Sequence, residues 1–449
     1  MRLEFPIREN VQAFIDQFIK TNGGTKEVEP LQSVARKTKN LSVQNMAFAI
    51  AIIREFFSSS DAIPLEHFFE FLLNKVLLIY VSTEDLEDAF RLFTILNNRG
   101  IPLRNSDILK SINLGALDSE TEKIKYARMW EEAEGDLGEE FDRFLAHLRT
   151  ILVKEKARSN LLQEFEDKIY EPKEKDKITG IIKPVLLQKG KPTFQFIERY
   201  LAYYKQLLGG SNYDVCQSFA FDNLVKVMIT GLPTTDWIPP LLAYYNKFHD
   251  SRLLEFLRKL NAKFAGDWIS QRTPTDRIEA MSNVISAVDK AETVEEVLAS
   301  ETLDFDSDMF LRVCDGDVYG RRFALYILLV LDYIFQNHDQ KMHFETLSVE
   351  HILPQNPSDS SQWVKDFSTE ERTTWTDRLG NLVLITRRKN ASQGRLDYAE
   401  KKAKYFEKNI DTCPNSLRVL HDYSIWAPKQ LKENHNLVRE KIQQFFGLP

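Results

Sequence analysis

The sequence predicts a mainly α-helical protein that carries a small segment of two strands and a helix near its carboxyl end. Over most of the chain, apolar residues recur every three to four positions, which is the period of a helix packed on a core. Two short apolar runs, at residues 348–354 and 379–386, lie close together and favour strands. A chain of 449 residues is long enough for two or three domains, and we expect regions at 1–115, 116–300 and 301–449.

The composition is that of an ordinary globular protein, with 43% hydrophobic and 28% charged residues. The net charge of −7 excludes a uniformly basic coat, so any nucleic-acid surface must be local. Three scattered cysteines without CxxC spacing exclude a cysteine-built zinc site and give no disulfide framework. Because the sequence has neither a long apolar span nor a signal pattern, we expect no membrane association and a cytoplasmic protein.

The amino-terminal region is expected to be helical. Apolar stripes predict helices at residues 11–18, 46–57 and 67–76, followed by a strand at 77–82 and a helix at 83–96. The loop from Asn97 to Gly100 has two interpretations. It is a helix cap followed by a turn, or it faces a nucleotide, with Arg99 on a phosphate and Asn97 orienting a water or base.

The middle of the chain predicts a helical scaffold. Helical spacing of apolar residues is found at 126–145, 194–208, 218–229, 237–248, 252–264 and 321–334. The acidic run at 304–317 is interpreted as a solvated loop, with a metal site as the alternative. We expect this region to couple the amino-terminal domain to the carboxyl-terminal one.

The segment at residues 348–404 has the layout of a ββα metal finger. The first strand carries His351 into a turn, where Pro354 and Pro357 stop regular structure. Asn381 opens the second strand, which is apolar and β-branched. Asn390 stands where a helix begins, since apolar residues take helical spacing from residue 391 onward.

Two blocks of the sequence are similar to one known family. The runs EHILP at 350–354 and GNL at 380–382, together with Asn390, resemble the HNH nuclease domain of GmrSD-type modification-dependent restriction endonucleases. Upstream, AFRLFTILNNRGIPL at 89–103 and SDILK at 106–110 resemble the second signature of that family's nucleotide-hydrolysing domain. The resemblance implies a partial NTPase-like domain at 1–115, with weak nucleotide contacts from Asn97, Arg99, Asp107 and Lys110.

An earlier signature of that hydrolytic domain, Asp-Gly-Gln-Gln-Arg, does not occur in this sequence. Three accounts stay open: a truncated sequence, a separate subunit that supplies the first block, or a lineage that lost NTP hydrolysis. An NTP stays open as a cofactor, and we expect no NTP hydrolysis by this chain alone.

Phosphodiester hydrolysis needs a deprotonated water, relief of charge at the phosphate, and correct positioning. His351 is the candidate base, because imidazole is substantially neutral at cellular pH. The resemblance implies that Asn381 holds the His351 loop, and that Asn390 and Glu350 are ligands of Mg²⁺ or Mn²⁺. Neighbours on a strand point to opposite faces, so Glu350 reaches the same site as His351 only if the strand ends there.

A basic patch follows the second strand. Residues 387–408 contain eight basic and three acidic side chains, and we expect Arg388, Arg395, Lys401 and Lys402 to bind phosphate. Together with this patch, the resemblance implies an HNH-type endonuclease or nickase of a prokaryotic defence system, acting on foreign or base-modified double-stranded DNA. The alternative is a non-catalytic regulatory subunit that binds nucleotide and DNA.

Overall fold

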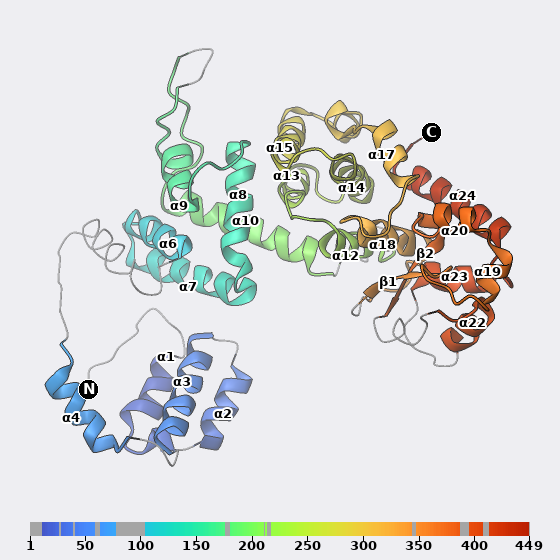
Figure 1. The fold of residues 1–449 in the computed structure, drawn as a ribbon. Coiled ribbons are helices and arrows are strands. Elements are labelled where there is room, and N and C mark those ends of the chain that lie inside the picture. Colours follow the sequence, from blue (N-terminus) through green and yellow to red (C-terminus); the bar gives the residue numbers. More distant parts are fainter. Residues whose placement is uncertain are drawn as a thin grey trace. The chain divides into compact units, whose positions relative to one another are not determined.

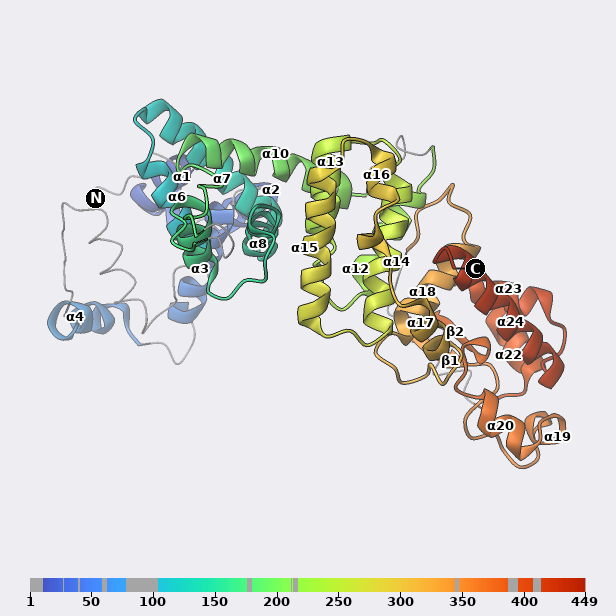
Figure 2. The ribbon, with the colours of Figure 1, turned by 90° about the horizontal axis from the view of Figure 1, so that it is seen from above.

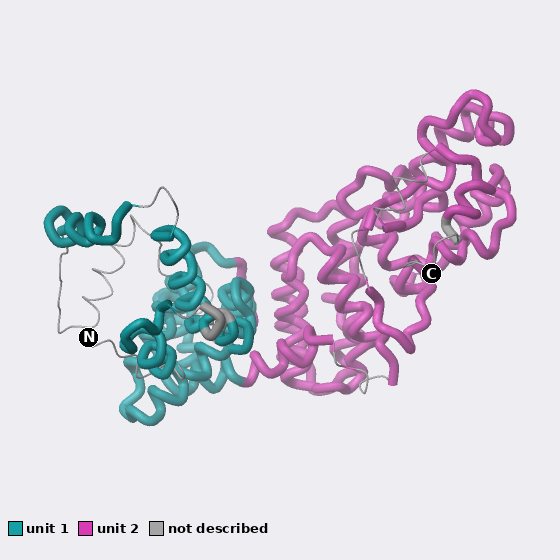
Figure 3. The backbone as a smooth tube through the Cα atoms, turned by 90° about the horizontal axis from the view of Figure 1, so that it is seen from below, with its two compact units in different colours: residues 1–149, 157–198 teal, residues 150–156, 199–449 magenta. Residues whose placement is uncertain are grey.

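The computed structural model describes residues 11–26, 28–38, 41–58, 63–77, 104–175, 180–210, 212, 217–343, 347–386, 395–406 and 413–448. These residues are mainly helical, as the sequence predicts (Figure 1). The chain divides into two compact units, residues 1–149 with 157–198 and residues 150–156 with 199–449 (Figure 3). The region boundaries expected at residues 116 and 301 stay predictions.

The first unit contains helices only among its described regular elements, where η marks a 3-10 or π helix. They are α1 (Val11–Phe14), η1 (Ile15–Lys20), η2 (Gly24–Lys26), α2 (Val28–Lys37), α3 (Leu41–Ser58), α4 (Leu65–Lys75), α6 (Asn105–Gly115), α7 (Glu120–Leu137), α8 (Glu140–Val153), α9 (Leu161–Glu164), η3 (Phe165–Tyr170) and α10 (Lys191–Leu208), of which α8 and α10 run on into the second unit.

The first helices of this unit enclose a small core of their own. The stripe predicted at 11–18 is buried, and it packs against one residue of α2 and two of α3. The members of this core are Val11, Phe14, Ile15, Phe18, Leu31, Val43 and Ala47. The predicted helices at 46–57 and 67–76 correspond to α3 and α4.

The prediction of a single helix at residues 126–145 is wrong. Residues 126–145 form parts of two helices, because Gly138 takes a φ of 54° and ends α7. The strand predicted at 77–82 falls outside the described residues except for Leu77, which lies in no regular element. The predicted helix at 83–96 and the loop at 97–100 also lie outside the described residues.

The second unit combines a helical layer with two strands. Its elements are α12 (Ala220–Gly231), α13 (Ile238–Phe248), α14 (Leu253–Ile269), α15 (Pro274–Lys290), α16 (Val294–Leu298), η4 (Glu301–Leu303), α17 (Ser307–Cys314), α18 (Ala324–Phe335), β1 (Leu347–His351), α19 (Gln362–Asp366), α20 (Thr369–Trp375), η5 (Leu379–Asn381), β2 (Leu382–Thr386), α22 (Tyr398–Phe406), α23 (Pro414–Asp422) and α24 (Pro428–Phe445).

The predicted middle helices are present as α10, α12, α13, α14 and α18. The loop predicted at 304–317 is wrong, because α17 occupies its centre. Asp306 caps this helix by accepting a hydrogen bond from the backbone of Met309 at 2.9 Å. Phe310 and Cys314, one helical turn apart, are both buried.

Helix α18 is the central element of the second unit. Its sequence ALYILLVLDYIF is apolar on all sides, which is typical of a helix that is buried all round. It packs against α12 on one side and against β1, β2, α23 and α24 on the other, between the helical layer and the strands (Figure 2). This helix therefore packs against both strands and supports them.

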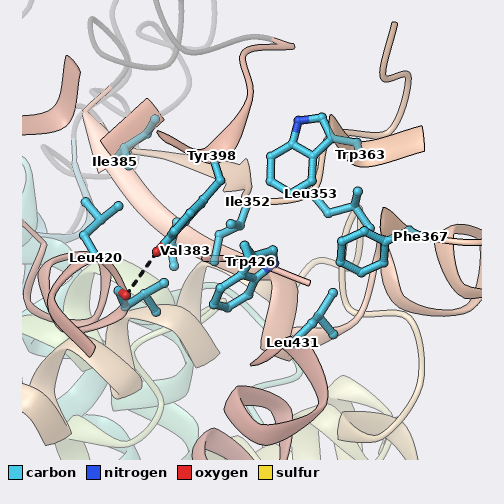
Figure 4. Close-up of a cluster of buried hydrophobic side chains, with 11 residues drawn as sticks. Ile352, Leu353, Trp363, Phe367, Val383, Ile385, Tyr398, Leu420, Trp426 and Leu431 are labelled. Carbon is cyan, nitrogen blue, oxygen red and sulfur yellow. Dashed lines mark hydrogen bonds between the residues drawn. The ribbon is translucent and has the colours of Figure 1, made fainter. Parts of the chain in front are cut away.

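Both predicted carboxyl-terminal strands form, and they pair antiparallel. The register places Leu347 opposite Thr386 and His351 opposite Leu382. All five residues of β2 are buried, as expected for a continuous apolar run. The surrounding core draws on the strands, the turn after β1 and the helices that follow (Figure 4). It contains Ile352, Leu353, Trp363, Phe367, Val383, Ile385, Tyr398, Val419, Leu420, Trp426 and Leu431.

Candidate active site

His351 is the last residue of β1, where the chain leaves the sheet for the turn that begins at Ile352. The side chain is buried, with 8% of its surface exposed. Pairing with Leu382 fixes the backbone of His351, since both residues belong to the ladder. The strand therefore holds the imidazole at a defined edge of the sheet.

Asn381 clamps the turn that follows His351. Its Oδ1 accepts a hydrogen bond from the backbone of Leu353 at 2.8 Å, and its Nδ2 donates to the Leu353 carbonyl at 2.9 Å. Nδ2 also donates to the carbonyl of Thr376 at 2.8 Å, and the Asn381 carbonyl accepts from Ile352 at 3.0 Å. Because this amide is fully buried, each of these bonds replaces a lost contact with water. The position matches the predicted one beside the His351 loop.

A carboxylate that the sequence reading did not select contacts His351 directly. Nε2 of His351 lies 2.9 Å from Oδ1 of Asp377, in the turn between α20 and η5. The same oxygen accepts a hydrogen bond from Nε2 of Gln355 at 3.0 Å. The Asp377 side chain is 37% exposed, so this contact lies at the edge of the fold rather than in its core.

The surroundings of His351 favour the neutral imidazole. Burial lowers the pKa of His351, and the hydrogen bond to Asp377 opposes this effect. The ring of Tyr319 lies 4.2 Å from the imidazole, centroid to centroid, and contributes to that burial. A neutral imidazole is the form that can accept a proton.

Glu350, the preceding residue, forms a buried ion pair with Lys401 of α22. Nζ of Lys401 donates to Oε1 of Glu350 at 2.7 Å and to the His351 carbonyl at 2.7 Å. Burial lowers the pKa of Lys401, and the charge of Glu350 opposes this. The amine of Lys401 is thus engaged inside the protein, where it ties α22 to β1.

Of the other residues predicted to bind phosphate or metal, two lie within the described part of the chain and two outside it. Lys402 donates to the carbonyl of Tyr423 at 3.1 Å, and Arg395 is exposed just before α22. Arg388 and Asn390 lie outside the described residues. The structure therefore places His351, Asn381, Glu350 and Lys401 close together. Of the predicted phosphate-binding residues that are described, Lys402 and Arg395 remain candidates for a basic surface.

The residues predicted to contact nucleotide belong to the first unit. Asp107 closes a capping box at the start of α6 by accepting from the backbone of Arg104 at 3.3 Å. Lys110 pairs with Glu131 of α7 at 3.0 Å. Asn97 and Arg99 lie outside the described residues. The two described residues thus have structural partners, and their nucleotide role stays a prediction.

Across the described part of the chain, no three His, Cys, Asp or Glu side chains come together as a metal site. Asn390, the predicted amide ligand, lies outside the described residues. Beside the Glu350–Lys401 pair lies a cavity of about 40 Å³, walled by Val383, Ile385 and Tyr398 among others. Such a space holds about one or two waters and is too small for a nucleotide.

Three residues of this site, Asp377, Gln355 and Tyr319, are not among the predicted site residues, and they differ in how visible they are in the sequence. Asp377 stands four residues before Asn381 in a polar segment. A carboxylate so close to the motif residues Gly380 and Asn381 is a sequence signal for a site residue. Gln355 lies in the turn after the motif histidine. Tyr319 is far upstream of β1, and no pattern in the sequence joins it to His351.

A family model for the C-terminal domain of GmrSD restriction endonucleases matches residues 305–441. Over these residues the chain is similar to the GmrSD family. The GmrSD match contains His351, Asn381, Asp377 and Tyr319, so one domain carries the whole cluster around the imidazole. A GmrSD domain indicates a restriction endonuclease of a defence system, with DNA as its substrate. No curated protein matches the chain.

The GmrSD match does not reach the upstream block at 89–110, so the partial NTPase-like domain stays a prediction. Of the helices within the described ranges, none is long and apolar enough to cross a membrane.

Proposed function

We propose that this chain is an HNH-type, metal-dependent endonuclease or nickase that hydrolyses phosphodiester bonds in foreign or base-modified double-stranded DNA. The observation that carries the proposal is His351 at the end of β1, within the GmrSD match, on a turn clamped by Asn381. The preference for modified DNA rests on the resemblance to GmrSD enzymes alone.

In this proposal His351 removes a proton from the attacking water. The neutral imidazole is favoured by burial, and the clamp of Asn381 keeps the following turn, and with it the histidine, in one position. Lys402 and Arg395, with Arg388 on the segment after β2, contact the phosphates of the DNA backbone. Lys401 stays with Glu350 and orients its carboxylate.

A bound Mg²⁺ or Mn²⁺ would stabilise the charge that develops on the phosphate and on the leaving oxygen. Glu350 and Asn390 would hold this ion, since carboxylate and amide oxygens are the donors that such ions prefer. In support of this role, Lys401 engages only Oε1 of Glu350, and no described residue is assigned to Oε2.

The first prediction tests the base. His351→Ala is expected to abolish plasmid cleavage in the presence of magnesium or manganese, because the water loses its proton acceptor. DNA retention, measured by a gel-shift assay, should stay unchanged. His421→Ala is the matched control, because the His421 side chain is 87% exposed in the same domain.

Plasmid nicking by His351→Ala at the rate of the unaltered protein would exclude His351 as the base. Retention of DNA without any cleavage by the unaltered protein, with or without an NTP, would favour the regulatory subunit instead.

A further inference from the structure

Asp377 is placed to decide which nitrogen of His351 carries the proton. An ionised carboxylate only accepts hydrogen bonds, so the 2.9 Å contact between Oδ1 and Nε2 requires a hydrogen on Nε2. Gln355 donates to the same oxygen at 3.0 Å. Within the described part of the chain, no hydrogen-bond partner is assigned to Nδ1 of His351. In the neutral ring, the lone pair is then on Nδ1.

The backbone of Asp377 is fixed by the segment before α18. Its carbonyl accepts two hydrogen bonds, from Val318 at 2.9 Å and from Tyr319 at 3.1 Å. The backbones of Asp317 and Arg378 form an isolated antiparallel β-bridge beside it. The carboxylate therefore approaches the imidazole from a support that is independent of β1.

Tyr319 joins this support to the histidine itself. Its backbone binds Asp377, while its ring packs on the imidazole at 4.2 Å between centroids. The imidazole is thus contacted by the Asp377 carboxylate, through a hydrogen bond, and by the ring of Tyr319. Packing restricts its rotation, and the hydrogen bond selects its tautomer.

We propose that Asp377 is a positioning residue that holds His351 as the Nε2–H tautomer and directs the Nδ1 lone pair at the attacking water. This role deepens the proposed function and rests on it for the water. In the step, a proton passes from water to Nδ1 while the water oxygen bonds to phosphorus and the bond to the leaving oxygen breaks. The leaving oxygen takes a proton from solvent, and the imidazolium, stabilised by the Asp377 carboxylate, returns its proton to solvent.

The test reads the tautomer directly. Nitrogen chemical shifts of the imidazole rings are recorded on the full chain labelled at histidine, without metal, at a pH where the ring is neutral. The chain has 8 histidines, and subtracting the spectrum of His351→Ala assigns the one of interest. We expect a protonated Nε2 in the unaltered protein and a mixture of tautomers in Asp377→Ala.

Cleavage kinetics give the second readout. Asp377→Ala is expected to lower kcat for plasmid nicking by about 10- to 100-fold, the usual cost of losing a partner that orients a catalytic side chain, with KM for DNA unchanged. Asp377→Asn keeps the shape of the side chain, but its amide can donate to Nε2 and favour the wrong tautomer, so kcat should also fall. Asp359→Ala removes an exposed carboxylate of the same domain and serves as the control.

A protonated Nδ1 in the unaltered protein, or an unchanged tautomer in Asp377→Ala, would overturn the role of Asp377. Thermal melting of each variant separates this result from loss of folding, and Asp377→Asn covers the case in which Asp377→Ala unfolds. If the tautomer responds as expected but the unaltered protein cuts no DNA, the positioning of His351 holds and the nuclease proposal fails.

Discussion

The sequence predicts that Lys401 contacts DNA, but in the structure its amine donates to two acceptors inside the fold, Glu350 and the His351 carbonyl. Its side chain is 6% exposed and that of Glu350 is 13% exposed, so the pair is largely withdrawn from water. A charge in such a place is tolerated because its partner and the His351 carbonyl replace the lost hydration. The pair thus has a structural role whatever Glu350 does for catalysis.

Lys401→Met is therefore expected to reduce the free energy of unfolding by about 3 kcal/mol, because Glu350 is left buried without its partner. Urea denaturation measures this. Lys402→Met is the matched control on the next position of α22, and it should cost well under about 1 kcal/mol. Equal losses for the two variants would contradict the structural role of the pair.

At this scale, the sequence predicts the motif residues of the candidate site better than the residues that contact them. His351 and Asn381 stand within short motifs whose residue types fit the reaction. Asp377 and Tyr319 act through contacts across the fold, and a hydrogen bond between positions 351 and 377 depends on how the turn before η5 is folded. The nearness of Asp377 to Asn381 in the sequence marks it as a candidate, but its contact with His351 does not follow from local sequence.

At the scale of elements, η5 and α24 are in close contact at Gly380. A Cβ at this position would lie 2.5 Å from both Cα and Cβ of His435. The two elements are also joined by hydrogen bonds, from Asn434 to the Gly380 carbonyl at 2.6 Å and from the Gly380 backbone to Nδ1 of His435 at 3.3 Å. This contact sets the start of β2, and so the position of Asn381.

Gly380→Ala is expected to destabilise the domain by more than about 2 kcal/mol, because a backbone atom of α24 has to move. Thermal melting and denaturation by urea report the loss. Gly316→Ala is the control: the nearest atom to its Cβ would be 3.6 Å away, so its stability should stay within about 1 kcal/mol. A tolerated alanine at Gly380 would mean that α24 can slide along η5.

Element types were predictable where the apolar period is strong, as in α12, α13, α14 and α18, and in both strands. The errors have local causes. A single glycine, Gly138, divides a continuous apolar pattern into α7 and α8. The segment at 304–317 contains five aspartates and so resembles a solvated loop, although two buried residues one turn apart are enough to anchor the short helix α17.

At the scale of the second unit, Asp332 is an ionisable group in the middle of its most apolar helix. It is 1% exposed, and its Oδ1 accepts a hydrogen bond from the backbone of Asn415 at the start of α23 at 2.9 Å. Burial raises the pKa of Asp332 to about 7. One side chain thus connects two helices and couples their stability to protonation.

The sign of this coupling follows from the raised pKa. The protonated carboxyl stabilises the fold fully below the unfolded pKa of about 3.9, and this contribution is lost as the pH rises through the folded value of about 7. The free energy of unfolding should therefore fall by about 2 kcal/mol between about pH 5 and pH 7 on account of this group.

Asp332→Asn, which keeps the acceptor oxygen but cannot ionise, should remove that part of the pH dependence in urea denaturation. Asp339→Asn, at an exposed position, should leave it intact. Parallel pH profiles for the unaltered protein and Asp332→Asn would show that the carboxyl titrates at an ordinary pKa.

The isolated β-bridge between the backbones of Asp317 and Arg378 has a practical consequence for protein engineering. A designer who wished to transfer the GmrSD-like domain to another protein would be tempted to excise it just ahead of β1, where its motif begins. That cut would discard Val318 and Tyr319, which brace the carboxylate beside His351. The portable piece has to start before Asp315, whose carbonyl receives Arg378 at 2.8 Å.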